Sequence, residues 1–444
     1  MERALNESVG KSFNKSAGAA RVVILDYIRA LLMIRIFLYH YYVEWFGASY
    51  FFVMDGPAAN VGRMWVFDGG VSGNGGAIDG FWSLAGWILA VFMNVFSWFF
   101  MYGFATVNVF LLISGFVLTL SMLNRGDGAG AGQAISKIHG IWLAVRKWVL
   151  FNWKRLRRLI VPFYIAVLAG ILFWYGRNLF FPQFADWPLF DLWDLGKLLV
   201  LPFLFFDMGL LQRFNGDYWF IVLILQLYLL FPVLYWVLKK VGVWKFMFFV
   251  AVLTFGYRYY AAFYLDGAPS GVLLPTEHSY RIYSFFLPRL FEFSFGMALG
   301  WLYFSNNKIF ESFKKARWFW MGTAATLGGY FLLMYRWGWI FSDAVLGVGL
   351  FFLFFGIANW ISGYGKITNY LKKIGESAYE LYLWHHYFLN YFLMYLLFVL
   401  GLKGNEWVFF AVMPVYFVIV VYLGFFGKYL TGVAERAFAR LRGR

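Results

Sequence analysis

The chain has 444 residues, of which 62% are hydrophobic and only 14% are charged, and its formal net charge is +16. Charged side chains are too few to cover the surface of a water-soluble protein of this size. The composition therefore excludes an ordinary soluble protein and indicates an integral membrane protein. In that class a basic excess is typical of loops that face the cytoplasm rather than of nucleic-acid binding, and the absence of cysteine excludes disulfides and thiolate chemistry.

Ten stretches of the chain are long and apolar enough to cross a bilayer as helices, which takes about 20 residues each. The sequence therefore predicts an all-α, polytopic transmembrane bundle, with a mobile tail over 1–20, a membrane domain over 21–430 and a basic tail over 431–444. Two further stretches, 81–101 and 195–211, could be interfacial or re-entrant helices. The ten predicted spans are 22–46, 104–123, 159–175, 218–238, 246–265, 283–304, 318–335, 339–361, 378–400 and 407–426.

The basic residues fall unevenly on the two sides of these ten spans. With the N-terminus inside, 27 of the 38 Lys and Arg residues lie in cytoplasmic segments and seven lie on the opposite side. Because positive residues concentrate in cytoplasmic loops, this asymmetry predicts that both termini are cytoplasmic. It also accounts for the net charge without a nucleic-acid partner.

The first predicted span carries five ionisable residues, Asp26, Arg29, Arg35, His40 and Glu44. At 100° per residue, Arg29 and His40 lie about 20° apart on one helix face and about 16 Å apart along the axis. Asp26 and Glu44 fall on the same side, whereas Arg35 points elsewhere. Ionisable groups inside a span are costly and mark functional sites. The alternative interpretation is that His40 is bonded to a neighbouring helix and that Asp26 and Arg29 snorkel at the interface.

Six segments along the chain form a combined pattern. The first is LDYIRALLMIRIFLYH, with Arg, ten residues and then His, and the other five are FLLISGFVLTL, KRLRRLIVPFY, YWFIVLILQLYLLFP, RLFEFSFGMALG and ESAYELYLWHH. In this order, over nearly the whole chain, the six segments together resemble the acyltransferase 3 family of integral membrane acyltransferases. The chain departs from the family pattern at Ile224, Leu225 and Ala378.

The resemblance implies a multi-pass enzyme of the cell membrane that moves an acyl group from acyl-CoA to a hydroxyl of a cell-surface or exported carbohydrate. Acetyl is the expected group and acetyl-CoA the expected donor substrate, with no permanently bound cofactor. His40 is the candidate catalytic base, because imidazole titrates near neutrality, and Glu44, one turn further on, is the candidate for orienting it. The expected partners are acyl-CoA, a carbohydrate or glycolipid acceptor and the lipid bilayer.

The other candidate residues divide into two groups. Arg29, Arg155, Arg158 and His385 are expected to bind the donor, since guanidinium groups pair well with phosphates. His385 and His386 are placed about 12 Å from the cytoplasmic start of their span, below the level of His40. No metal site is expected, because the sequence has five histidines, no cysteine and no close zinc-type spacing. Supporting or structural roles are expected for Asp26, Ser114, Tyr228 and Glu292.

Two other classes of function stay open on the sequence. In a proton-coupled transporter, the ionisable residues of the first span would form a proton path. In a membrane sensor or scaffold of the same fold, His40 would have no catalytic role. Dependence on acetyl-CoA separates the first alternative from the enzyme, and the effect of replacing His40 separates the second.

Overall fold

The computed structural model describes residues 22–46, 91, 103–124, 137–184, 215–264, 285–306, 308–403 and 405–442, and all regular structure in these ranges is helical. The all-α prediction is therefore confirmed for the described part of the chain. Three predicted segments lie outside the described residues, namely the expected tail over 1–20 and the ambiguous stretches 81–101 and 195–211. Of these, only Val91 is described.

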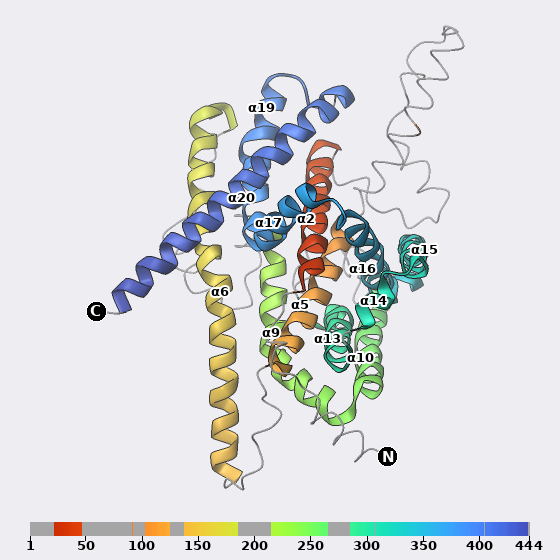
Figure 1. Ribbon diagram of the computed structural model, residues 1–444. Coiled ribbons are helices and arrows are strands. Elements are labelled where there is room, and N and C mark those ends of the chain that lie inside the picture. The colour runs from red at the N-terminus through yellow and green to blue at the C-terminus, as the bar shows by residue number, and fades with distance from the viewer. Residues whose placement is uncertain are drawn as a thin grey trace.

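The helices of the first half follow the predicted apolar stretches. The predicted span at 159–175 forms only part of a 44-residue helix, α6, which carries Pro162 and projects beyond the bundle at one end (Figure 1). The elements are α2 (Val23–Phe46), η2 (Gly103–Ala105), α5 (Thr106–Leu123), α6 (Lys137–Phe180), η3 (Pro182–Phe184), η5 (Gly216–Tyr218), α9 (Trp219–Val241) and α10 (Val243–Tyr264).

The second half contains shorter helices and one long one. The predicted span at 378–400 is divided by a π-helical turn, η8, and the last helix continues past the expected boundary at 430 as far as Arg442. The elements are η6 (Leu287–Arg289), α13 (Leu290–Ser305), α14 (Ile309–Phe313), α15 (Ala316–Leu333), η7 (Trp337–Ile340), α16 (Ser342–Ile361), α17 (Gly365–Glu376), α18 (Ala378–Phe388), η8 (Leu389–Leu393), α19 (Met394–Val399) and α20 (Glu406–Arg442).

Six helices of the described ranges combine the length and apolar composition that a membrane crossing requires. The other four predicted spans correspond to helices that do not meet both requirements. α2 carries five ionisable residues, and α13 has only 16 residues. The membrane class is thus supported. The qualifying segments are Gly103–Leu123, Trp148–Phe180, Trp219–Val241, Val243–Tyr264, Ser342–Ile361 and Trp407–Leu441.

Helix α2 stands near the centre of the bundle, with α6 and α20 to one side and α15 and α10 to the other (Figure 1). It packs against α5, α16, α17, α18 and α20. Its apolar side chains Ile28, Leu32, Met33 and Phe37 are fully buried. The most charged predicted span is therefore enclosed by protein, which is the setting in which ionisable residues at membrane depth are tolerated.

Glycine brings α17 into direct contact with the backbone of α2. A Cβ atom placed on Gly375 would lie 1.9 Å from the carbonyl oxygen of Asp26. Because that neighbour is backbone, it cannot rotate away. This contact fixes where the α17–α18 segment begins along α2.

We expect Gly375→Ala to lower the stability of the fold by roughly 1–3 kcal/mol, since the added methyl group must push two helices apart. Gly365→Ala on the same helix is the matched control, because a Cβ there meets nothing within 4 Å. Thermal unfolding in detergent measures both. Equal midpoints for the two variants would contradict the close contact.

Candidate functional site

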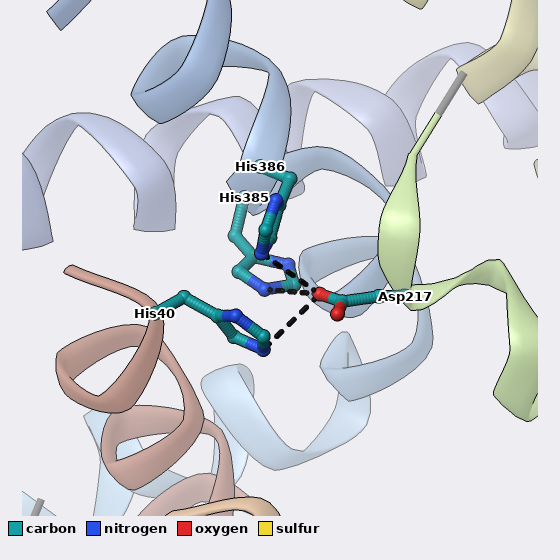
Figure 2. Close-up of side chains that lie close together, drawn as sticks. All are labelled: His40, Asp217, His385 and His386. Carbon is teal, nitrogen blue, oxygen red and sulfur yellow. Dashed lines mark ion pairs between the residues drawn. The ribbon is translucent and has the colours of Figure 1, made fainter. Parts of the chain in front are cut away.

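Three histidines converge on one carboxylate oxygen. The Nε2 atoms of His385 and His386 each lie 3.1 Å from Oδ2 of Asp217, and Nε2 of His40 lies 3.2 Å from the same atom. Figure 2 shows the three rings facing Asp217 from α2, α18 and the segment that precedes α9. We call these four residues the His–Asp cluster.

The two rings of α18 reach one point although consecutive helical residues point about 100° apart. The ring centroids of His385 and His386 are 4.8 Å apart and their planes are nearly perpendicular. His40 approaches from α2, with centroids 4.2 Å from His386 and 5.1 Å from His385. Phe37, one turn before His40, packs its ring 5.3 Å from His385. Aromatic packing between α2 and α18 thus holds the imidazoles together.

Asp217 is held in place through its backbone. Asn215 caps the η5 turn, and its Oδ1 accepts a hydrogen bond of 2.9 Å from the Asp217 amide. The Tyr382 hydroxyl of α18 donates to the Asp217 carbonyl oxygen, and the hydroxyls of Tyr218 and Tyr387 bond to each other. These contacts join η5 to α18, so the carboxylate and two of the histidines are positioned by one unit.

The second ring nitrogens of both α18 histidines are also bonded. Nδ1 of His385 lies 2.7 Å from the Tyr382 carbonyl oxygen, and Nδ1 of His386 lies 2.9 Å from the side-chain amide of Asn390. Asn390 lies in the π-helical turn η8, and π turns inside helices often occur at functional sites. The orientation of both rings is therefore set by their immediate neighbours.

The four side chains of the cluster are buried to different degrees. The His385 side chain is fully buried, those of His386 and Asp217 are 8% and 10% exposed, and that of His40 is 16% exposed. Burial favours the neutral acid, but the charges of His386, His40 and His385 outweigh it and hold the pKa of the Asp217 carboxyl well below its ordinary value. Asp217 is therefore an ionised carboxylate at neutral pH, with His40 as its most accessible neighbour.

Two neighbouring cavities are lined in part by basic residues. One, of about 270 Å³, is lined by Arg29, Ser114 and Tyr382, among others. The other, of about 480 Å³, is lined by Arg155, Arg158 and Lys428 together with three carboxylates, Glu376, Glu380 and Glu435. The two cavities share the walls Leu159, Tyr228, Glu376 and Tyr379.

The predicted site residues divide between the cavities and the cluster. Arg29, Ser114 and Tyr228 line the first cavity, and Arg155 and Arg158 line the second. His40 and His385 are members of the cluster, whereas His385 does not line either cavity. Their proposed roles in catalysis and in donor binding stay predictions.

Three predicted residues have other settings. Asp26 is buried and pairs with Arg29 at 3.0 Å. Glu44 lies half-buried one turn beyond His40, and Asp217 is the carboxylate at His40 Nε2. Glu292 is buried in α13, near Arg289 in the sequence. Arg289 pairs with Asp343 at 2.5 Å, a partner that the sequence analysis did not foresee.

The sequence reasoning missed Asp217 and misjudged the depth of His385 and His386. The estimate that these two histidines lie below His40 is wrong, because all three rings meet. It assumed that α18 starts level with α2, whereas Gly375 lies against Asp26, about one turn inside the start of α2. Asp217 directly precedes the YWF motif, and this acidic residue next to a family motif was the available signal.

A family model described as an acyltransferase domain matches residues 22–427, nearly the whole chain. The chain belongs to the acyltransferase 3 family. The match covers every residue of the cluster and of the first cavity, whereas four residues of the second cavity lie beyond it, namely Lys428, Thr431, Gly432 and Glu435. Comparisons with curated proteins and with solved structures found no match. Membership in the acyltransferase 3 family implies acyl transfer by a membrane protein.

Proposed function

We propose that the protein transfers an acyl group, with acetyl as the preferred group, from acyl-CoA to a hydroxyl of a cell-surface or exported carbohydrate at the cell membrane. The observation that carries this proposal is that Tyr382, which bonds to Asp217 of the His–Asp cluster, lines one cavity, and that this cavity shares four lining residues with the cavity of Arg155, Arg158 and Lys428. A thioester arm bound among the arginines would thereby approach a base.

In this proposal the donor would occupy the two neighbouring cavities in a definite direction. Arg155 and Arg158 would bind the CoA phosphates, and the acyl-pantetheine arm would extend past Tyr228 and Arg29 toward Tyr382. Three carboxylates also line the second cavity, which we call the outer cavity. The phosphates would therefore have to contact the arginines directly rather than depend on a net positive field. Arg29 to His40 is eleven residues, about 16 Å along α2, a span suited to an extended arm.

The chemistry needs one base and no cysteine. During catalysis, Nε2–H of His40 would donate a hydrogen bond to Asp217 Oδ2, 3.2 Å away, and Nδ1 would hold the lone pair that takes the proton of the acceptor hydroxyl. The hydroxyl oxygen bonds to the thioester carbonyl carbon, the carbon–sulfur bond then breaks, and the CoA thiolate leaves with the proton from His40. The transferred group forms an ester, and no oxidant or second nucleophile is required.

The proposal includes the sidedness inferred from charge. The bundle would cross the membrane about ten times with both termini in the cytoplasm. Acyl-CoA would then enter from the face where α6 carries Arg155 and Arg158, and the carbohydrate would approach from the opposite face, where α2 ends after His40.

The proposed function is tested with purified protein in liposomes and acetyl-CoA labelled in the acetyl group. We expect slow hydrolysis of the donor without acceptor, and transfer of label to glycan when carbohydrate acceptors are present. Glycan mass spectrometry of cells with and without the protein identifies the acceptor by the loss of acyl groups. A protein that leaves acetyl-CoA intact and instead responds to a proton gradient would be a transporter.

Arg155→Ala combined with Arg158→Ala is expected to raise the KM for acetyl-CoA by about 10- to 100-fold, because each substitution removes a charge-assisted hydrogen bond to phosphate. The KM for the acceptor should change little. Arg157→Ala is the matched control, since Arg157 is on the same turn of α6 but does not line the outer cavity. If the acceptor KM rises while the donor KM stays constant, the assignment of the donor cavity is wrong.

A further inference from the structure

The His–Asp cluster contains three buried polar atoms that make no hydrogen bond. These are Oδ2 of Asp217 and the Nε2 atoms of His385 and His386. Each Nε2 is 3.1 Å from the oxygen, so the three atoms face one another at contact distance. Buried groups of this kind are costly unless something between them satisfies all three.

The tautomer of His385 places a second hydrogen-bond acceptor opposite the Asp217 oxygen. A backbone carbonyl only accepts, so the Tyr382 carbonyl at 2.7 Å requires a proton on Nδ1 of His385. The neutral ring then has a bare lone pair on Nε2, which points at a carboxylate oxygen that is also an acceptor. Two acceptors at this distance repel each other unless a cation lies between them.

His386 also directs a lone pair on Nε2 at Asp217 when the hydrogen bonding of its neighbour Asn390 is considered. The side-chain amide of Asn390 lies 2.9 Å from Nδ1 of His386, while Asn390 Oδ1 is buried without a hydrogen-bond partner. The oxygen and nitrogen of an amide are interchangeable by rotation. With the amide turned, His386 Nδ1–H donates to Oδ1, which satisfies that oxygen and leaves a second lone pair on Nε2 directed at Asp217.

Protonation of every ring is a poor solution, because the three ring centroids are only 4.2–5.1 Å apart. Three imidazolium groups around one carboxylate would leave two uncompensated positive charges in an enclosed site. One divalent ion supplies positive charge at a single point and keeps the rings neutral.

We propose that His385, His386 and Asp217 bind a divalent transition-metal ion, with Zn²⁺ as the ion that fits best. Ligand atoms in a tetrahedral zinc site are separated by about 3.3 Å, since Zn–N and Zn–O distances are about 2.0–2.2 Å. The 3.1 Å separations match this spacing, and all four potential ligand atoms of the cluster lie within 4.8 Å of one another. Two imidazoles and a carboxylate are ligands for zinc, and acyl transfer involves no redox step.

The surroundings also match a metal centre. Metal-bound histidines donate their second ring proton to a carbonyl or similar acceptor, as His385 does to Tyr382 and His386 does to the turned Asn390 amide. Three protein ligands leave one coordination position open, the arrangement of catalytic zinc sites. His40, the most exposed member, has Nε2 3.2 Å from the Asp217 oxygen and would lie near that position. This step rests on the proposed function: the acceptor hydroxyl would bind there, become more acidic and lose its proton to His40.

The test measures metal content, independently of acyl transfer. The full chain, carrying an affinity tag without histidine, is purified from zinc-supplemented cells and analysed by inductively coupled plasma mass spectrometry. We expect about one zinc per chain, and less than a tenth of that in His385→Ala and in Asp217→Asn. Glu311→Gln, at a side chain that is 67% exposed and paired with Lys314, is the control and should retain zinc.

Cobalt provides the second measurement, in case a variant folds poorly. Protein from metal-depleted cells is titrated with Co²⁺, and the visible absorption bands of a tetrahedral centre should appear at one equivalent. Asn390→Ala, which keeps all three ligands, should weaken Co²⁺ binding by about 10- to 100-fold. A wild-type protein that takes up neither Zn²⁺ nor Co²⁺ beyond the level of His385→Ala overturns the metal site.

The outcomes for the metal and for the acyltransferase activity are separable. Stoichiometric zinc without any acyl transfer would support the metal site and contradict the proposed function. Full acyl transfer by protein shown to be free of metal would uphold the proposed function and overturn the metal inference.

Discussion

His40→Ala is expected to reduce acyl transfer by roughly 10²- to 10⁴-fold, the range that general-base catalysis contributes. His40 is the most accessible ring of the cluster, and its Nε2 lies 3.2 Å from Asp217. The substitution removes the proton acceptor but leaves the other three members in place. The KM for acetyl-CoA should stay within about threefold of wild type, because the donor phosphates would bind among Arg155 and Arg158, in a cavity that His40 does not line.

The experiment compares turnover and thermal midpoint in the same detergent preparation. Leu38→Ala is the matched control, since Leu38 lies two residues earlier on α2, is only partly buried and is not a cluster member. We expect the control to keep most of its turnover. Retention of most wild-type activity by His40→Ala would remove His40 from the base role.

The absence of cysteine leaves two routes for the acyl group, direct transfer or an acyl-imidazole on His40. We expect direct transfer, because an extended donor arm could span the roughly 16 Å between the levels of Arg29, which lines the first cavity, and His40. Protein incubated with labelled acetyl-CoA and then freed of donor should carry no label. Label that stays on the wild type, moves to acceptor when chased and is missing from His40→Ala would establish the acyl-histidine route.

Local periodicity accounts for the part of the site that the sequence could predict. Asp26, Arg29 and His40 lie on one helix, where angular spacing is fixed by backbone geometry, and Arg29 pairs with Asp26 while His40 lies in the cluster. The basic motif at Arg155 and Arg158 was found instead through its resemblance to the family pattern. Both residues line a cavity, and their role in donor binding stays a prediction.

Tertiary placement accounts for what the sequence could not predict. Asp217 is 177 residues from His40 and lies in the short 3-10 helix η5, so no periodic pattern connects the two. Its position depends on the Asn215 cap and on the Tyr382 hydroxyl from α18. The meeting of His385 with His40 likewise depends on where α17 contacts α2. That offset comes from the packing of Gly375 on Asp26 and has no signature in hydropathy.

Asp217→Asn is expected to reduce turnover by roughly 10³- to 10⁴-fold, comparable to the loss of the carboxylate from a catalytic triad. The amide has nearly the same shape as the acid, so packing against η5 and α18 is preserved. What disappears is the negative charge that three imidazoles share within 3.1–3.2 Å. His40 would lose the acceptor for its Nε2 proton, and its other nitrogen would become a weaker base.

A graded series separates this charge effect from a positional one. Asn215→Ala removes the cap that holds the Asp217 amide and should cost about 1 kcal/mol of stability with a modest loss of turnover. Asp217→Glu keeps the charge but moves it by one methylene, so intermediate turnover is expected. If Asp217→Asn and Asn215→Ala lose activity equally, the carboxylate acts through the shape of the η5 turn. A much larger loss for Asp217→Asn, with an unchanged KM for acetyl-CoA, places its role in the chemical step, because the donor would still bind normally to a site that can no longer take the hydroxyl proton.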